Sequence, residues 1–441
     1  MQTKVRLGDA FTLIGGGTPS TNRVEYWGEG TPWFSSADID AKGKISYRRC
    51  VTQIGIKNST TNIVPANTVI VVTRVGLGKI AILPENMCFS QDMQALLAKD
   101  DSFVYSRKYL YYQLVHIMET VKYQGQGTTI SGITKNRLAD VMLYMPGIEE
   151  QQRIVARIEE LFSQLDDAEA TLQKTKAQLA LYRQAVLREA FEGKLTEDWR
   201  KRNGTTKQCL IQLAREKRDT ALACRKLKPL KYEWKDDIIL PSIPHEWEYA
   251  QIGDIAWSIK DGPHYSPEYS EEGVPFITGG NVRPTGVDFQ SAKRISMDLH
   301  KELCKRCCPE KGDMLYTKGG TTGIAHVNTY DQEFSVWVHV AVIKFVDSVL
   351  PEYFQHVLNS PLCYQQSQKY THGVGNQDLG LTRMINIIFP ICSIEEQKQI
   401  VANLESRLSV CDSIEQTIDA ALQQAKAMRQ SILKDAFEGR L

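Results

Sequence analysis

Residues 148–155 read IEEQQRIV, and residues 394–401 read IEEQKQIV, which is 246 positions later (394 − 148). The same offset carries QAVLREAFEGKL at 184–195 onto QSILKDAFEGRL at 430–441. A repeat with this long a period indicates a duplicated domain and not an array of short units. Each copy places its globular part first and its helix second, so we expect the chain to engage something with two-fold character.

Weaker landmarks extend the repeat into the two globular parts, here called heads. Leu-Gly-Asp at 7–9 matches Ile-Gly-Asp at 252–254, and Thr-Arg at 73–74 matches Thr-Lys at 317–318. Between such landmarks the heads differ almost everywhere, whereas the helical segments match well. This contrast favours a common frame that presents two different surfaces.

The bulk composition is that of an ordinary globular protein. A chain of 441 residues is expected to form two or three domains, each large enough for a core. No apolar run is long enough to span a membrane, and the first residues lack the apolar region of a secretory signal. The ten cysteines are scattered, which fits reduced thiols. We therefore expect a cytoplasmic protein with no membrane partner.

The densest cysteine cluster is Cys304-x-x-Cys307-Cys308, which follows His300. A structural zinc site needs a second pair of ligands, and the sequence has no other C-x-x-C and no H-x-x-x-H. We predict no metal in this chain and interpret the cysteines as apolar positions of a short helix before Pro309.

Charge is distributed unevenly, although the net charge is only +1. Residues 194–235 contain 13 Lys and Arg against 5 Asp and Glu, a surplus of eight (13 − 5). Such a stretch can neutralise phosphates. A solvated linker is the other interpretation, and the sequence does not separate the two.

Two heptad seams predict long helices. Apolar residues recur at alternating spacings of four and three over 154–186 and again over 400–432, as in coiled coils. Gly193 and Gly439 stand where glycines commonly end helices. Each helix has roughly 43 residues and thus a length of about 65 Å. We expect the two helices to pair antiparallel within the chain, with one head at each end, and to set the distance between the heads.

Each head is predicted to be α/β. The β-branched run at 69–73 is typical of a buried strand, and further strands are expected at 80–83 and 93–97. Apolar residues at helical spacing predict a helix over 106–122. Its counterpart in the second head is expected from 351 to about 369.

Motifs that would indicate an enzyme are either absent or lack the structural context that they require. Residues 76–81 match G-x-G-x-x-A, a dinucleotide fingerprint that requires a following helix, but another strand is predicted there. We interpret 76–81 and the related 318–323 as tight turns. The sequence contains no P-loop and no amino-methyltransferase motif. Glu192-Gly193-Lys194 formally completes a nuclease-like set, but capping at a helix end explains it better.

The arrangement as a whole resembles the specificity subunit of type I restriction–modification enzymes. Each head is closed by Pro-x-x-x-Glu-x-Gln, at 146–152 and in a longer form at 390–397, before a heptad helix that ends in Ala-Phe-Glu-Gly-Lys/Arg-Leu. Gly-Gly-Gly-Thr-Pro-Ser at 15–20 before Tyr26-Trp27, and the segment 240–247 before the second head, are also similar to that family. The resemblance covers essentially the whole chain.

The resemblance implies an organisation and a division of labour. It divides the chain into a first target-recognition domain (1–147), a central spacer helix (148–193), a basic linker (194–238), a second target-recognition domain (239–392) and a C-terminal spacer helix (393–441). It implies double-stranded DNA as ligand and no catalysis or cofactor in this chain. Two partner methyltransferase subunits would use S-adenosylmethionine to methylate adenine, and a further restriction subunit would cleave DNA with ATP and Mg²⁺.

The second head departs from the family pattern, because Lys-Asp-Gly-Pro-His-Tyr at 260–265 replaces the glycine-rich segment. We therefore expect an asymmetric, bipartite target. Bases are read by side-chain donors and acceptors in the major groove, and the candidates in the first head are Thr18, Ser20, Asn22, Tyr26, Arg74, Lys79 and Gln126. Those in the second head are Lys260, His264, Tyr265, Lys318, Thr321, Thr322 and Asn376. Each has a structural alternative as a core or turn residue, and a coiled-coil scaffold for proteins alone is the alternative function.

Overall fold

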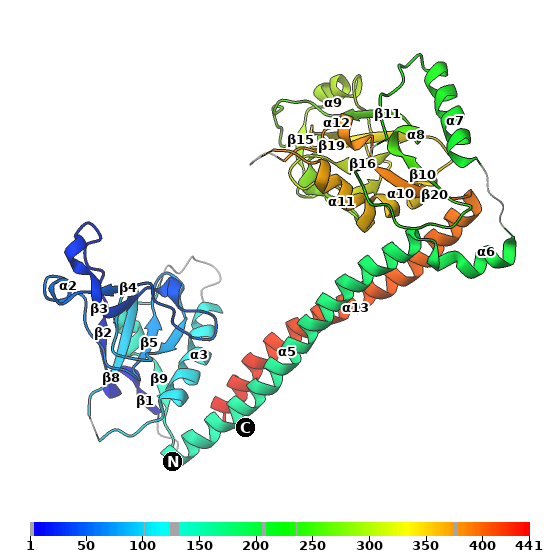
Figure 1. The fold of residues 1–441 in the computed structure, drawn as a ribbon. Coiled ribbons are helices and arrows are strands. Elements are labelled where there is room, and N and C mark those ends of the chain that lie inside the picture. Colours follow the sequence, from blue (N-terminus) through cyan, green and yellow to red (C-terminus); the bar gives the residue numbers. More distant parts are fainter. Residues whose placement is uncertain (1–3, 101, 124–131, 205–208, 235–236, 374–376) are drawn as a thin grey trace. The chain divides into compact units, whose positions relative to one another are not determined.

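The computed structural model describes residues 4–100, 102–123, 132–204, 209–234, 237–373 and 377–441 (Figure 1). The chain divides into two units, of which the first comprises residues 1–174 and 418–441 and the second comprises residues 175–417. Each unit contains one head and a part of each long helix. None of the helices described is both long and apolar enough to cross a membrane.

The first head is built on a four-stranded antiparallel sheet in the order β2-β8-β5-β6. Its strands are β2 (Phe11–Gly15), β5 (Val69–Val72), β6 (Ile80–Ile82) and β8 (Met93–Ala98). The predicted β-branched strand is β5, which is buried over its whole length. Its side chains alternate between two cores, because Val69 and Val71 belong to one cluster and Ile70 and Val72 to the other.

Smaller elements complete the first head. A three-stranded sheet has the order β4-β3-β7, and β1 pairs with β9. The bounds of these strands are β1 (Lys4–Arg6), β3 (Trp27–Phe34), β4 (Arg49–Val51), β7 (Cys88–Phe89) and β9 (Met142–Tyr144). The helices are α1 (Leu7–Ala10), α2 (Gln53–Lys57), α3 (Arg107–Tyr123) and α4 (Lys135–Ala139), with short 3-10 turns at Val24–Tyr26 and Ser36–Asp38. The helix expected at 106–122 is therefore confirmed as α3.

The second head repeats this topology. Its four-stranded sheet has the order β11-β19-β16-β17, its three-stranded sheet the order β15-β12-β18, and β10 pairs with β20. The strands are β10 (Glu248–Gln251), β11 (Ala256–Asp261), β12 (Val274–Ile277), β13 (Val282–Arg283), β14 (Gly286–Val287), β15 (Lys293–Ile295), β16 (Met314–Thr317), β17 (Ala325–Val327), β18 (Ser335–Val336), β19 (Val340–Phe345) and β20 (Ile388–Ile391). The common frame inferred from scattered landmarks is thus a shared pattern of strand pairing.

The helical parts of the second head differ from the expectation in one place. The segment from 351 to about 369 was expected to match the single helix of the first head, but it forms α10 (Pro351–Leu358) and α11 (Pro361–Tyr370). Pro361 cannot continue a helix, and the Ser360 side chain caps the new one by accepting from the Cys363 N–H. The other helices of this head are α8 (Ile252–Ile255), α9 (Met297–Cys304) and α12 (Leu381–Met384), with a 3-10 turn at Gly279–Asn281.

The turn after β5 contains the sequence that resembles a dinucleotide fingerprint. Gly76 and Gly78 have φ angles of 81° and 86°, a region that favours glycine. The turn joins β5 to its antiparallel neighbour β6, and no helix follows. The interpretation of residues 76–81 as a tight turn is confirmed.

The long helices are α5 (Ile148–Phe191) and α13 (Ile394–Phe437), and each has 44 residues. They run antiparallel within each unit (Figure 1). In the first unit Arg429 lies 2.6 Å from Asp166, while residue 441 reaches back to Arg153. In the second unit Arg183 lies 2.7 Å from Asp412. The predicted antiparallel pair is confirmed.

The ion pairs between the helices occur at equivalent positions of the repeat in the two units. Arg429 of α13 contacts Asp166 and Glu169 of α5, at 2.6 and 3.4 Å. At the positions 246 residues away, Arg183 of α5 contacts Asp412 and Glu415 of α13, at 2.7 and 2.9 Å. Each arginine is roughly three-quarters buried, so these pairs are less screened than pairs at an open surface.

The repeated motifs at the two ends of each helix join the helices to the heads. In the first unit the Gln151 amide accepts from the Ser106 N–H and donates to the Pro146 carbonyl, both at 2.8 Å. Phe437, from the end of the other helix, packs edge-on against Tyr109 at 5.4 Å. Both contacts hold the start of α3, so one helix supplies its beginning to the head and the other supplies its end.

The second unit uses the equivalent residues. Gln397 accepts from the Leu350 N–H and donates to the Cys392 carbonyl, both at 2.8 Å, and Phe191 packs edge-on against Tyr353 at 5.4 Å. Gly193 and Gly439, with φ angles of 77° and 74°, end the two helices as predicted. The strongest part of the repeat is therefore the junction between head and helices.

We expect Phe191→Ala to lower the free energy of unfolding by about 3–5 kcal/mol, because it removes a buried ring and leaves a cavity. Phe191 is 3% exposed, whereas Leu181 of the same helix is 72% exposed. Leu181→Ala is the matched control and should change stability by less than about 0.5 kcal/mol. Urea unfolding followed by circular dichroism measures both. Equal losses in the two variants would contradict the junction described here.

Candidate nucleic-acid interface

The residues nominated from the sequence are distributed over loops of both heads. Those exposed in the first head are Thr18, Ser20, Asn22 and Arg74, while Tyr26 and Lys79 are half-buried. Those exposed in the second head are Lys260, His264, Tyr265 and Thr321, while Lys318 and Thr322 are buried. Gln126 and Asn376 lie outside the described residues.

The glycine-rich loop of the first head is held by two indole groups. The Trp27 Nε1–H donates to the Ser20 carbonyl at 3.1 Å, and the Trp33 Nε1–H donates to the Gly17 carbonyl at 3.0 Å. A Cβ on Gly17 would lie 2.5 Å from Thr60 Oγ1, so this glycine is required by close packing. The Thr18 hydroxyl donates to Gln91 at 2.5 Å. The loop is thus fixed by its backbone, and it leaves the Ser20 and Asn22 side chains exposed.

A groove of about 600 Å³ opens beside this loop. Its lining residues are Thr21, Val24, Trp27, Gly28, Tyr47, Arg48, Arg49 and Cys50. The Arg49 guanidinium lies 5.6 Å from the centre of the Trp27 ring. The Arg48 side chain is 89% exposed and lies 4.0 Å from the Asp38 carboxylate. No acidic residue is among the lining residues, so the groove combines positive charge with exposed apolar and aromatic surface.

Sequence reasoning missed Arg48, Arg49, Tyr47 and Val24 of this groove. A signal was present, because Tyr-Arg-Arg at 47–49 places an aromatic residue beside two cations. Lys79, by contrast, was nominated as a base contact. Its ammonium donates to the carbonyls of Ser36 and Ile39, at 3.0 and 2.7 Å, and so holds the turn after β5 against the neighbouring loop.

The corresponding loops of the second head meet in a network of charges around Asp261. The Asp261 carboxylate is almost fully buried and lies 2.7 Å from Arg306 and 3.4 Å from both Lys318 and His264. Lys318 also lies 3.0 Å from Asp378. The structure therefore brings the nominated His264 and Lys318 together, but it turns Lys318 into a buried structural cation with a side chain 4% exposed.

A smaller groove of about 400 Å³ adjoins this network. Its lining residues are Asp261, Gly262, Pro263, His264, Tyr265, Glu302, Leu303, Arg306, Cys307 and Val336. Both acidic and basic side chains line this groove, and Tyr265 is 55% exposed. Arg306 and Glu302 were not nominated, since nothing in the sequence connects α9 with the loop after β11. The two heads thus present surfaces of different charge on one frame.

Thr322 and the adjacent turn complete the second site. The Thr322 hydroxyl lies 3.1 Å from both Gln368 and Thr371, so it ties the turn after β16 to α11. Thr321 remains exposed next to it. Burial, assisted by the positive charge of Lys318, lowers the pKa of His339. That imidazole is therefore neutral at pH 7, and it packs against Trp337 with ring centres 4.4 Å apart.

The cysteine cluster lies at the end of α9. Cys304 Sγ is 3.6 Å from His300 Nε2, and burial raises the pKa of the Cys304 and Cys307 thiols to about 12. These thiols are therefore protonated at neutral pH. In the part of the chain that the structure describes, no group of three or more His, Cys, Asp or Glu residues could hold a metal ion.

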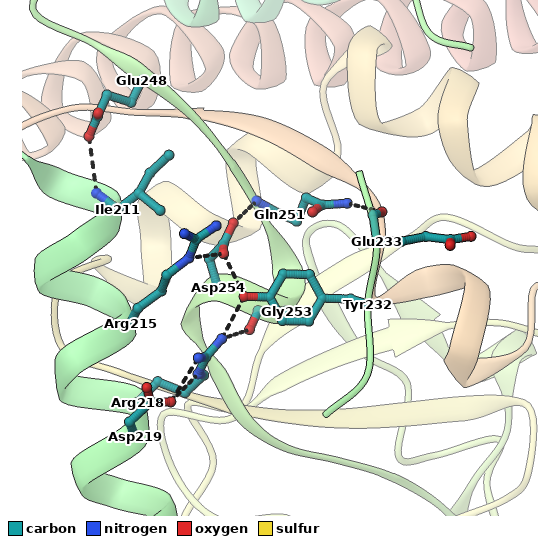
Figure 2. Close-up of polar contacts among 10 residues, drawn as sticks. All are labelled: Ile211, Arg215, Arg218, Asp219, Tyr232, Glu233, Glu248, Gln251, Gly253 and Asp254. Atoms are coloured by element: carbon teal, nitrogen blue, oxygen red, sulfur yellow. Dashed lines mark hydrogen bonds and ion pairs between the residues drawn. The ribbon is translucent and has the colours of Figure 1, made fainter. Parts of the chain in front are cut away.

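The basic segment before the second head is mostly helical. It forms a 3-10 turn at Lys194–Thr196, α6 (Glu197–Asn203) and α7 (Leu210–Cys224). Several of its cations contact acids of the same unit, for example Arg200 with the buried Glu396 and Arg215 with Asp254 (Figure 2). These ion pairs fix α6 and α7 within the second unit. Other cations of the segment, including Arg202, Arg225 and Lys228, are exposed, so the solvated and the phosphate-binding interpretations of these residues both stay predictions.

Comparison with known families finds the same two-fold division. The family model for the type I restriction modification DNA specificity domain matches residues 2–178 and again residues 244–424. The EcoBI specificity subunit of Escherichia coli is 26% identical to this chain over 347 residues. That alignment covers 76% of this chain and 66% of the EcoBI subunit, so the chain spans about two thirds of the length of this relative.

Two solved structures share the fold. A chain from a study of complex assembly and conformational transition of the type I R-M system has a TM-score of 0.66 and 18% identity, with 100% of this chain and 98% of that chain covered. The HsdS subunit from Thermoanaerobacter tengcongensis has a TM-score of 0.51 and 18% identity, with 100% and 97% covered.

The positions Arg74 and Lys318 match in the repeat and differ in environment, which gives a paired test. Lys318→Met should lower the free energy of unfolding by about 3–5 kcal/mol, because it leaves the buried Asp261 carboxylate without one of its cations. Arg74→Met, at an exposed position, should change it by less than about 0.5 kcal/mol. Guanidinium unfolding measures both. A small loss in Lys318→Met would show that Arg306 alone suffices for Asp261.

Proposed function

Since this chain belongs to the type I restriction–modification DNA specificity family, we propose that each of its heads reads one half of an asymmetric, bipartite DNA target. The observation that carries the proposal is that the two heads share one strand pattern but present different surfaces. The strand order is the same in both heads, while the grooves beside equivalent loops differ in volume, charge and side chains. A common frame with two unlike surfaces suits a target with two unlike halves.

The first head offers the groove next to its glycine-rich loop as the reading surface. Arg48 and Arg49 supply the paired donors that guanine accepts best in the major groove, and Val24, 82% exposed, suits a thymine methyl group. Ser20 and Asn22 add hydrogen-bonding groups at the edge, with Thr18, Tyr26, Arg74 and Gln126 as further contacts. Lys79 acts through the loop that it holds.

The second head is proposed to read through the exposed side chains around the Asp261 network. Lys260, His264, Tyr265 and Thr321 face solvent, and Asn376 is retained as a contact from the sequence. Lys318 and Thr322 act as positioning residues, because their polar atoms are engaged within the head. Phosphate contacts from exposed lysines and arginines would fix the register without reading sequence.

The long helices are proposed to fix the gap between the half-sites and to dock two methyltransferase subunits. Large apolar side chains remain exposed on them, including Leu181 at 72% and Val410 at 57%. Exposed apolar positions on a helix pair suit packing against further helices. In this proposal the partner subunits bind S-adenosylmethionine, or ATP with Mg²⁺ where cleavage occurs, and this chain supplies recognition without catalysis.

The proposed location is the cytoplasm. All ten cysteines are free in the structure, which suits a reducing compartment, and the proposed ligand is double-stranded DNA of the cell or of an invader. A scaffold for proteins alone is the alternative function, and the grooves of the two heads do not favour it over the role of the family.

Exchange of residues 1–147 for the equivalent head of a relative tests the modular role. We expect the methylated sequence of the assembled complex to change in one half only, because the junction residues that hold the heads are repeated while the grooves are not. Methylation mapping by single-molecule sequencing of host DNA provides the measurement. A change in both halves would disprove independent reading.

The double variant Arg48→Ala, Arg49→Ala tests the groove of the first head. We expect the affinity for the cognate duplex to fall at least tenfold, since a good bidentate base contact contributes about 1–3 kcal/mol. If both side chains touch phosphates instead, the slope of log K against log salt flattens by about 0.9 for each. The control is the double variant Arg107→Ala, Lys108→Ala, which removes two consecutive exposed cations of α3. Equal effects of the two double variants would remove this groove from the interface.

A further inference from the structure

Helix α7 is docked on the second head by ion pairs. The acidic partners in these pairs have equivalents in the first head. Arg215 lies 2.7 Å from the buried Asp254, and Lys217 lies 2.7 Å from Asp347. Arg218 donates to the Gly253 carbonyl at 2.7 Å. Figure 2 shows Arg215 and Arg218 reaching from the helix to Asp254 and Gly253. On the apolar side, Leu210 and Ala214 belong to the core of the second head. The helix therefore binds through both charge and apolar contact.

The repeat identifies the equivalent face of the first head. Leu-Gly-Asp at 7–9 corresponds to Ile-Gly-Asp at 252–254, which places Asp9 at the position of Asp254. The strand registers locate the second acid. Phe11 pairs with Ala98 in the first head, and Ala256 pairs with Phe345 in the second. Two residues beyond these partners lie Asp100 and Asp347. Both acids that bind α7 thus have counterparts in the first head.

In the first head this face is a groove of about 330 Å³. Its lining residues are Val5, Asp9, Ala10, Lys99, Asp100, Ser102 and Phe103. The Asp9 side chain is 67% exposed, whereas that of Asp254 under α7 is 2% exposed. Val5, Ala10 and Phe103 supply apolar surface, as the core residues beneath α7 do. The groove keeps the acids and the apolar floor of the docking site but is open.

The cations near this groove are few and leave the acids accessible. Arg6 lies 3.8 Å from Asp9, and it also bonds to Asp140 on the other side. Lys99 donates to the Gly8 carbonyl at 2.6 Å, which is the contact that Arg218 of α7 makes with Gly253. Asp100 accepts from the Ser102 N–H at 2.8 Å and has no ion pair among the described residues. Asp100 is thus left without a cation among the described residues, and Asp9, which is 67% exposed, has only the 3.8 Å contact with Arg6. Both carboxylates can therefore accept a cation of a ligand.

We propose that this groove of the first head, bounded by β1–α1 and the loop after β8, binds a basic amphipathic helix of another polypeptide. The ligand carries two cations where α7 has Arg215 and Lys217, and small apolar residues where α7 has Leu210 and Ala214. A cation at the position of Arg218 is unnecessary, because Lys99 already bonds to the equivalent carbonyl. A second copy of this chain does not supply the helix, since α7 is engaged by its own second head. The proposal is independent of DNA reading.

A peptide of residues 210–223 with a fluorescent label is the probe, and the full chain is the protein. We expect saturable binding by fluorescence anisotropy, and loss of binding when the peptide carries Arg215→Glu and Lys217→Glu. Asp9→Asn with Asp100→Asn in the protein should weaken binding about fivefold, the size expected for two exposed ion pairs. Glu29→Gln with Glu85→Gln removes two exposed acids elsewhere in the same head and should leave affinity unchanged.

Hydrogen–deuterium exchange locates the bound peptide. Protection of residues 4–12 and 99–103 supports the proposal. Protection confined to residues 248–258 would mean that the peptide only replaces the resident α7, and it would overturn the proposal, as would the absence of saturable binding. Self-association of the chain that disappears in Asp9→Asn, Asp100→Asn would assign the groove to a second copy and would overturn the assignment to another polypeptide.

Discussion

Each head of this protein is completed by the beginning of one long helix and the end of the other. In the first unit the core contains Ile154 and Ile158 from α5 together with Leu433 and Ala436 from α13. In the second unit it contains Phe191 from α5 and Ile400 from α13. These contacts join segments that are far apart in sequence. Their formation therefore costs the entropy of closing a long loop of the chain. The first head therefore depends on the last residues of the chain.

This junction explains why the helices are repeated more faithfully than the heads. Gln151 and Gln397 each bond to one backbone N–H at the start of a helix of the head and to one backbone carbonyl just before the long helix. A shorter or apolar side chain would leave those groups without these partners. The interhelical arginines, Arg429 and Arg183, each contact an Asp and a Glu at equivalent positions of the repeat. In the part of the chain that the structure describes, the exposed side chains of the loops beside the two grooves form no hydrogen bond or ion pair with the long helices, so the junction does not restrict how they differ between the heads.

One break in the duplication gives the two heads different neighbours. The second head has α7 on the face that includes Asp254, whereas the same face of the first head is open. An exposed ion pair contributes little by itself, but Asp254 is buried and also accepts from the Tyr232 hydroxyl at 2.8 Å (Figure 2). The docking of α7 therefore rests on a satisfied buried carboxylate, a kind of contact that is costly to break.

The sequence alone was sufficient for the features that rest on period and local chemistry. The heptad seams indicated the antiparallel helices, the β-branched run indicated β5, and the glycines after Phe191 and Phe437 indicated the helix ends. Each follows from backbone geometry and near neighbours. The break between α10 and α11 also had a local signal, since Pro361 follows a capping serine, but helical spacing on both sides concealed it.

Tertiary structure decided which polar residues are available at the surface. Thr-Arg at 73–74 and Thr-Lys at 317–318 look equivalent, yet Arg74 is exposed and Lys318 is buried. The difference arises because Asp261, the last residue of β11, lies 3.4 Å from Lys318, while the first head has Gly16 at that place of the repeat and offers no carboxylate. Burial of a charge depends on a partner brought from elsewhere in the chain. Arg48, Arg49 and Arg306 lie in grooves formed by separate segments of the chain, so their places too were decided only when the chain folded.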